Sequence, residues 1–292
     1  MSSTELLGTD AAIEFGSVRF SANLSILFTD VPFLERFSRA SRAGFRAVEF
    51  WWPSDVIAES LVAGARDAGT QVVLFNLDMG DPARGDRGLL SNPQQQGRFR
   101  ENAIEALELA ARLKCPRVHA PVGLRVRNLD RVEQLDLAQR NLAWVADRAR
   151  ERGIEILVEA LNVYDNGPCL ISTTQEATAL IDAVDRDNLR LQYDVYHAQR
   201  MEGNLVETIR RLHGRIGHIQ IADSPGRGEP GSGEIDYRTV LTAIDEVGYS
   251  GYIGLEYRPT TETTERSFEW LPGDGGYDNV SPDKLRLLSQ LN

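Results

Sequence analysis

Short apolar segments alternate with longer amphipathic stretches along this chain of 292 residues. The apolar segments have the length of strands and lie at residues 18–25, 47–52, 71–77, 117–123, 154–161, 189–195, 216–223 and 252–257. Between them, apolar residues recur at helical spacing at 33–44, 55–68, 98–113 and 130–152, and in stretches that begin near residues 174, 204 and 237. Eight strands alternating with seven or eight helices predict a parallel α/β fold, the (β/α)₈ TIM barrel, and the chain length suits one such barrel.

No linker-like stretch divides the chain, so we expect one barrel domain over residues 18–292, preceded by a flexible leader at residues 1–17. Residues 80–96 are rich in Gly, Asp, Pro and Gln, and we expect a long loop there without secondary structure. An irregular polar extension begins at about residue 260. We expect it to fold over the barrel and to end in a short helix.

Three of the later predicted strands have one polar face and one apolar face. Alternate residues of a strand point to opposite sides, so each strand carries a set of polar residues on one side, opposite an apolar set. A parallel strand covered on both faces normally reads as a continuous apolar run. The polar face should therefore look into the mouth of the barrel; its members are Glu155, Glu159, Arg190, Gln192, Asp194, His218 and Gln220.

Four of the predicted strands end in a residue with an oxygen ligand, at intervals of 35, 26 and 36 residues. These residues are Glu159, Asp194, Gln220 and Glu256. The intervals match one strand–helix unit, and the carboxyl ends of barrel strands converge on one face. An isolated carboxylate at a strand end more often pairs with an arginine or caps a helix, but several facing carboxylates without a cation would repel one another. The set therefore predicts a divalent metal site, with Mg²⁺ or Mn²⁺ as the cofactor.

Three further residues are candidates for contact with a substrate. His197 follows Asp194 by three residues and can reach an oxygen beside the metal, although a loop histidine is equally compatible with the spacing. Arg227 lies in a Gly-rich loop just beyond a strand, where it can bind a carboxylate through two hydrogen bonds or remain a solvated side chain. Asn76 ends the third strand. His218 could orient or replace Gln220 as a ligand, and Trp51 is more typical of packing.

Composition excludes several classes of protein. A net charge of −11 and a pI near 5.0 argue against a nucleic-acid partner. The first residues do not read as a signal peptide and no apolar run is long enough to span a membrane, so we expect a cytoplasmic protein without a membrane partner. A homo-oligomer is compatible with the sequence. No motif for a covalent nucleophile is present.

The segments that carry the candidate residues resemble the hydroxypyruvate isomerase family within the xylose isomerase-like TIM barrels. The resemblance covers roughly residues 18–260 and rests on RFSANLS, GFRAVEFWWP, ILVEALN, LQYDVYHAQRMEGNL, IGHIQIADSPGRGEPGSGEIDY and GLEYRPT. It implies that Glu159, Asp194, Gln220 and Glu256 hold the metal, and that Glu159 and Glu256 form the acid/base pair. Ketose 3-epimerases of the same superfamily usually have a histidine at the position of Gln220, so the glutamine favours the isomerase branch. Phe75 stands where the family often has a histidine, in a region expected to influence substrate identity.

The expected activity is therefore isomerisation of a small hydroxy-oxo acid, such as hydroxypyruvate to tartronate semialdehyde, by an enediolate mechanism. The nearest alternatives are a 2-oxo-tetronate isomerase and a ketose 3-epimerase. A metal phosphodiesterase of the endonuclease IV type shares the barrel, but it requires several zinc-binding histidines and a basic surface, whereas this chain has four histidines in all. A non-catalytic sugar-acid binder would not need the pair of glutamates.

Overall fold

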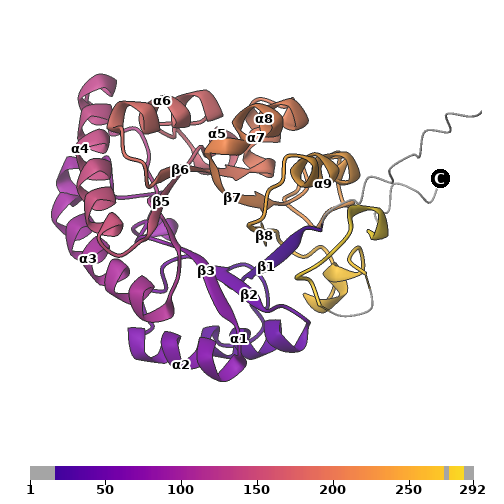
Figure 1. The fold of residues 1–292 in the computed structure, drawn as a ribbon. Helices are drawn as coiled ribbons and strands as arrows, with labels where there is room; N and C mark the ends of the chain where they lie inside the picture. The colour runs from indigo at the N-terminus through magenta and orange to yellow at the C-terminus, as the bar shows by residue number, and fades with distance from the viewer. Residues whose placement is uncertain (1–16, 273–275, 286–292) are drawn as a thin grey trace, which may run out of the picture.

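The computed structural model describes residues 17–272 and 276–285 and contains a closed barrel of eight parallel strands (Figure 1). The strands follow one another around the barrel in chain order, and the last pairs with the first. They are β1 (Arg19–Asn23), β2 (Ala47–Phe50), β3 (Gln71–Asn76), β4 (Arg117–His119), β5 (Glu155–Glu159), β6 (Leu189–Asp194), β7 (Ile216–Ile221) and β8 (Tyr252–Leu255). Each observed strand lies within a predicted one, so the predicted TIM-barrel class is confirmed.

The helices form a ring around the strands (Figure 1). They are α1 (Phe33–Arg42), α2 (Ala58–Ala68), α3 (Gln96–Leu113), α4 (Arg131–Arg150), α5 (Val163–Asn166), α6 (Thr174–Val184), α7 (Val195–Met201), α8 (Leu205–Leu212) and α9 (Tyr237–Glu246). Side-chain caps fix several starts; Asp130 accepts backbone N–H groups at the start of α4, and Thr173 does so for α6. No helix in the described ranges is long and apolar enough to cross a membrane.

The structure corrects one local prediction. Residues 80–96 are not wholly irregular, because they contain the 3₁₀ turns Pro82–Arg84 and Pro93–Gln95 and the first residue of α3. Asp81 and Asn92 cap these turns, which is what an Asp-Pro or Asn-Pro pair favours. The chain passes from β6 directly into α7, so His197 lies in a helix.

The predicted polar face of the later strands does look into the barrel. Gln192 donates to Gln220 at 2.6 Å, and both are buried. His218 and Gln220 on β7 bond to Glu49 on β2. Because β2 and β7 are not neighbours in the closed barrel, these bonds cross its interior. The apolar faces of the strands pack against the helices, as in other barrels of this class.

The segment after β8 packs beside β1 and α1. Trp270 lies edge-on to Phe20 with ring centroids 5.4 Å apart, and Phe268 contacts Phe45 at 5.0 Å. Val280 forms a bridge with Val18. The segment contains 3₁₀ turns at Glu265–Phe268 and Pro282–Lys284. The expected leader, except for its last residue, and most of the expected final helix lie outside the described residues.

Candidate active site

A cavity of about 190 Å³ lies where the strand carboxyl ends converge. Its lining comes from the ends of β3, β4 and β5, from the segments that follow β2, β3, β4, β5, β7 and β8, and from α7. The lining includes Glu159, Glu256, His197, Arg227 and Asn76, which the sequence selected, together with Trp51, Arg87, His119, Asp165 and Arg258, among others. Five predicted site residues therefore meet around one cavity.

Barrel geometry explains why the residues expected to hold a metal approach one another despite their separation in sequence. Glu159 pairs in register with Gln192, Asp194 pairs with Gln220, and Gln220 pairs with Gly254. Tilted strands give each neighbour a stagger along the barrel. The strand ends are thereby brought to a shared rim instead of being spread along the barrel axis.

Glu159, Asp194 and His197 form the tightest cluster of potential ligands. Each offers one ligating atom, and these atoms lie within 4.8 Å of one another. All three residues are buried. Glu159 Oε1 has no hydrogen-bond partner, while Oε2 lies 3.6 Å from Nε2 of the buried His119. An unpartnered buried carboxylate oxygen is costly, and a cation bound to the carboxylates of Glu159 and Asp194 would satisfy it.

The carboxyl groups hold their protons more tightly than free side chains do. Burial, followed by the charges of Asp194 and Glu256, raises the pKa of Glu159 well above its usual value. Burial and the charge of Glu256 raise the pKa of Asp194 to about 7. Burial also raises the pKa of Glu256, although Arg227 opposes the shift. Burial is the first cause of all three shifts, and repulsion between the neighbouring acids adds to it for Glu159 and Asp194.

Asp194 and Asn162 fix the orientation of His197. Asp194 ends β6 and caps α7, where its Oδ1 accepts from the backbone N–H groups of Tyr196 and His197. Asn162 Oδ1 accepts from the N–H of Asp165, so its Nδ2 is the group that faces His197 Nδ1, at 2.7 Å. His197 Nδ1 is therefore an acceptor, and a neutral ring carries its proton on Nε2. Nε2 lies 3.6 Å from Asp194 Oδ2. In this tautomer His197 is a hydrogen-bond donor and not a metal ligand.

Glu256 follows β8 and accepts hydrogen bonds from three side chains. Asn23 Nδ2 donates at 3.0 Å and Trp51 Nε1 donates at 2.6 Å to Oε1, and Arg227 Nη2 donates at 2.6 Å to Oε2. Trp51 thus does more than pack. Arg227 has a φ of 58° and its guanidinium lies 5.4 Å from the ring centroid of Tyr196. This strained backbone directs the arginine from its loop into the cavity.

Gln220, the fourth expected ligand, forms part of the polar network inside the barrel. Its Nε2 donates to Glu49 Oε1 at 2.7 Å, and its Oε1 accepts from Gln192. Glu49 is buried and also accepts from Ser21 Oγ and His218. The sequence analysis did not select Glu49. A lone acid within the apolar strand AVEF was the signal that could have identified it.

Phe75 does not take part in the cavity. It stacks on Phe50 at 5.5 Å and contacts Trp52 on the helix-facing side of β3. Phe75 itself therefore makes no contact with the cavity, whereas Met79 and Pro82 of the same region line it, and the influence of this region on substrate identity stays a prediction. The next residue, Asn76, points to the other face and lines the cavity.

Fold and site together define a TIM-barrel enzyme whose chemistry lies at the carboxyl ends of the strands. The chain belongs to the xylose isomerase-like TIM barrel family, whose model matches residues 37–273. It is 39% identical over 254 residues to a hydroxypyruvate isomerase of Escherichia coli, covering 87% of this chain and 98% of the relative. It is 38% identical over 245 residues to a 2-oxo-tetronate isomerase of Haemophilus influenzae, covering 84% and 95% of the two chains.

A solved structure is also similar in both fold and sequence. The crystal structure of AP endonuclease, family 2, from Brucella melitensis superimposes with a TM-score of 0.83 at 39% identity and covers 87% of this chain and 97% of that one. The predicted relationship to hydroxypyruvate isomerases and the predicted enzyme class, an isomerase, are confirmed by the curated relatives.

Proposed function

We propose that this enzyme isomerises a small hydroxy-oxo acid with the help of a divalent cation, and that Glu159 and Glu256 transfer the protons. The observation that carries the proposal is the buried group of carboxylates beside Arg227 in a cavity at the carboxyl end of the barrel. The names of the curated relatives support the same class of substrate.

Glu159, Asp194, Gln220 and Glu256 would hold the cation, because all four provide oxygen and a cation would relieve the repulsion between the buried acids. Mg²⁺ and Mn²⁺ suit this donor set. The unpartnered Glu159 Oε1 is the specific feature that fits a bound ion. Such an ion would supply electrostatic stabilisation of the negative charge that develops on the substrate oxygens.

The two glutamates would move one proton between adjacent carbons. One of them removes a proton from the hydroxyl-bearing carbon, which gives an enediolate, and the other delivers a proton to the former carbonyl carbon. The hydroxyl oxygen becomes the carbonyl oxygen and its proton passes to the former carbonyl oxygen, so hydroxypyruvate yields tartronate semialdehyde with no external oxidant. Raised pKa values suit this task, because a buried glutamate can then carry a proton near neutral pH.

Arg227, His197 and Asn76 would bind the substrate. The guanidinium of Arg227 uses one amino group for Glu256, and its Nε is buried without a partner, so it retains donors for a carboxylate. His197 can donate from Nε2 to a substrate oxygen. Asn76 ends β3 and lines the cavity, where its side-chain amide can form a hydrogen bond with the substrate.

Hydroxypyruvate is the substrate that we propose first, and 2-oxo-tetronate is the alternative. Both contain a carbonyl beside a carboxylate, which Arg227 can recognise. A ketose 3-epimerase is the third candidate, although the glutamine at position 220 argues against it.

Turnover of hydroxypyruvate in D₂O with added Mn²⁺ tests the proposal. Product that carries deuterium at the new C–H position supports proton transfer with solvent exchange. If neither three-carbon nor four-carbon oxo acids react with Mg²⁺ or Mn²⁺ present, the isomerase proposal is wrong. A parallel series with ketoses identifies an epimerase.

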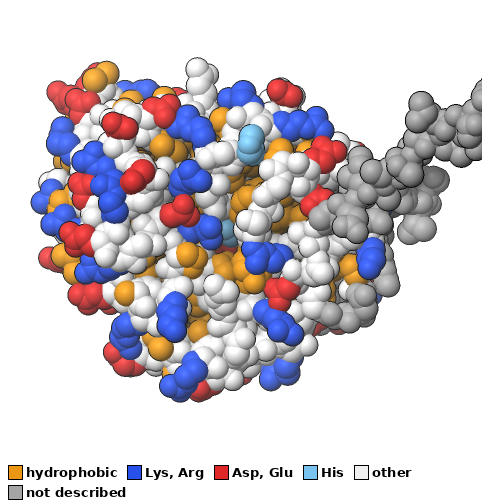
Figure 2. Space-filling model, viewed as in Figure 1, with side chains coloured by type: hydrophobic (Ala, Val, Ile, Leu, Met, Phe, Trp, Pro, Cys, Tyr) orange, Lys and Arg blue, Asp and Glu red, His pale blue; other side chains and the backbone are white. Residues whose placement is uncertain are grey.

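A metal phosphodiesterase is the candidate from another class, and the name of the similar Brucella melitensis structure is the observation that favours it. Charge argues against it: acidic and basic side chains are interspersed on the face in Figure 2, and the chain carries −11 overall. If the protein cuts duplex DNA at an abasic site, the phosphodiesterase function replaces the isomerase proposal.

A further inference from the structure

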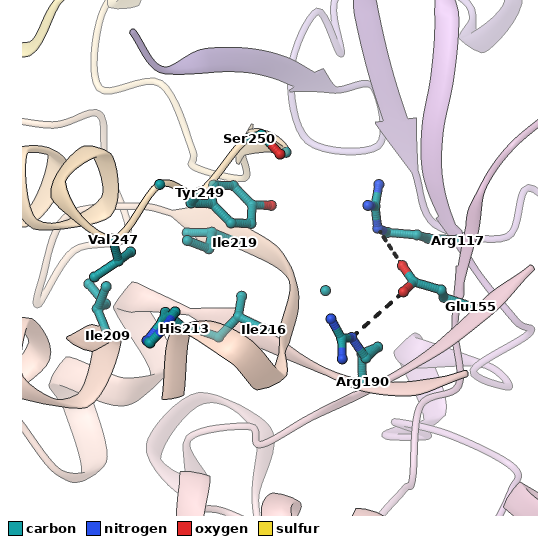
Figure 3. Close-up of a pocket in the computed structure, with 13 residues that line it drawn as sticks. Arg117, Glu155, Arg190, Ile209, His213, Ile216, Ile219, Val247, Tyr249 and Ser250 are labelled. Carbon is teal, nitrogen blue, oxygen red and sulfur yellow. Dashed lines mark hydrogen bonds and ion pairs between the residues drawn. The ribbon is translucent and has the colours of Figure 1, made fainter. Parts of the chain in front are cut away.

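A second cavity, of about 240 Å³, lies at the opposite end of the barrel (Figure 3). Arg117 and Glu155 begin β4 and β5, and Arg190 is the second residue of β6. The remaining lining comes from the end of α8, from the start of β7 and from the loop that joins α9 to β8. No residue of this cavity is shared with the candidate active site.

The carboxylate of Glu155 forms ion pairs with both arginines, on the side of their Nε groups. Arg117 Nε donates to Glu155 Oε2 at 3.1 Å, and Arg190 Nε lies 3.6 Å from Oε1 (Figure 3). The terminal Nη amino groups of the two arginines form no hydrogen bond with another described residue. They remain partly exposed, with 23% of the Arg117 side chain and 37% of the Arg190 side chain accessible. Glu155 therefore lies beside two guanidinium groups that remain partly exposed.

The residues around the second cavity leave room for its arginines and form its walls. A Cβ at Gly217 would lie 2.6 Å from Leu157 Cδ2 and 2.8 Å from Arg190 Cβ, so the absence of a side chain there leaves room for the stem of Arg190. Tyr249 donates its hydroxyl to the carbonyl of Tyr252 at 3.0 Å, which fixes the aromatic wall. Ile216 and Ile219 contribute apolar surface beside it (Figure 3).

The charge of this cavity is opposite to that of the whole chain. Two arginines and one glutamate leave one uncompensated positive charge in a concave space, while the chain carries −11. A concave site of one sign attracts small ions of the other sign. Paired guanidinium groups match the oxygens of a carboxylate or a phosphate.

We propose that this cavity, with Arg117 and Arg190 as its donors, is a binding site for a small oxyanion, either a carboxylate or a phosphate, separate from the active site. The proposal does not depend on the isomerase activity.

Isothermal titration of the full-length protein with inorganic phosphate, and separately with malonate, tests it. The stronger of the two ligands identifies the class of anion. Arg190→Gln and Arg117→Gln should each weaken binding about tenfold or more, since each removes a charged bidentate donor. Arg190→Lys keeps the charge but loses the planar fork, so its affinity should fall between those of wild type and Arg190→Gln.

Two matched variants separate this site from other sources of anion binding. Arg227→Gln removes the arginine of the candidate active site, and Arg66→Gln removes an exposed arginine on α2; both should retain this binding. Circular dichroism checks that every variant is folded. The proposal is overturned if wild type binds neither anion, if folded Arg190→Gln and Arg117→Gln bind as wild type does, or if Arg227→Gln alone abolishes binding.

Discussion

Glu49 accepts a hydrogen bond of 2.7 Å from the side-chain amide of Gln220 across the interior of the barrel. A carboxylate only accepts, so this contact fixes which end of the Gln220 amide carries its oxygen. The Oε1 atom of Gln220 therefore faces Gln192. Gln192 lies on β6, the strand on which Asp194 is in register with Gln220. Ser21 and His218 hold Glu49 in place through two further bonds. Glu49 thus positions a predicted metal ligand without being one itself.

Glu49→Gln should weaken metal binding about 10- to 100-fold, the usual effect of losing a group that orients a ligand. A glutamine at position 49 can present either an oxygen or an amino group, so the amide of Gln220 loses its fixed orientation. Titration of the purified protein with Mn²⁺, followed by electron paramagnetic resonance of the free ion, measures the change. Glu155→Gln, at the other end of the barrel, is the control and should bind Mn²⁺ as wild type does. Equal affinity in Glu49→Gln would show that Glu49 has no positioning role.

Gly254→Ala should destabilise the protein by about 1–3 kcal/mol, the usual range for overpacking a buried site. A Cβ at this position would lie 2.4 Å from both carboxylate oxygens of Glu49, so the buried network would have to move. Urea unfolding followed by circular dichroism measures the loss. Gly97→Ala is the matched control, because nothing lies within 4 Å of its Cβ and it lies in α3; it should be neutral or stabilising by up to about 1 kcal/mol. A Gly254→Ala protein as stable as wild type would mean that the interior has spare room.

Glu256→Gln and Glu159→Gln should each lower kcat for the preferred oxo acid by about 10²–10⁴-fold, since each removes a group that transfers a proton. Both residues are also expected to hold the metal, so Mn²⁺ affinity must be measured in parallel and the assay run at saturating metal. Glu246→Gln, an exposed residue paired with Arg210, is the control and should keep full activity. Full activity of Glu256→Gln at saturating metal would remove Glu256 from the proton-transfer step.

Stability in the presence of a chelator should fall as pH rises from about 4 to 7. Burial and the charge of Glu256 raise the pKa of Asp194 from 3.8 to about 7. Between these values the folded protein binds the proton more tightly than the unfolded chain does, so this contribution is complete at low pH and is lost as Asp194 ionises. Thermal unfolding from pH 4 to pH 8 measures the trend.

Asp194→Asn provides the control for this pH dependence, because asparagine still caps α7 but does not ionise. Its stability should change less over the same pH range, and adding Mn²⁺ to wild type at pH 8 should recover the lost stability. If the stability of wild type and of Asp194→Asn changes identically with pH, groups other than Asp194 cause the pH dependence.

The periodicity of hydrophobic residues identified the barrel, because residues close together in the sequence encode each strand–helix unit. The apolar run from Ile156 to Val158 and the helix that follows Thr173 have clear signals within a few residues, and the observed elements begin and end close to the predicted bounds. The short helices α5 and α7 were missed because four and seven residues are too few to show a clear helical period. Asn162 caps α5 and Asp194 caps α7, and the sequence analysis had considered Asp194 only as a metal ligand.

The sequence by itself determined the barrel and its polar interior, and it identified Glu159, Asp194 and Glu256 as acids at the strand ends. Side-chain alternation and strand spacing, on which these predictions rest, are properties of the chain alone. Only the tertiary structure decided which contacts those residues make. It joined Glu49 to Gln220, Trp51 and Arg227 to Glu256, and Arg117 to Arg190 through Glu155. These contacts link residues from separate strands and loops, and strand stagger and barrel closure, which no local pattern encodes, set their distances.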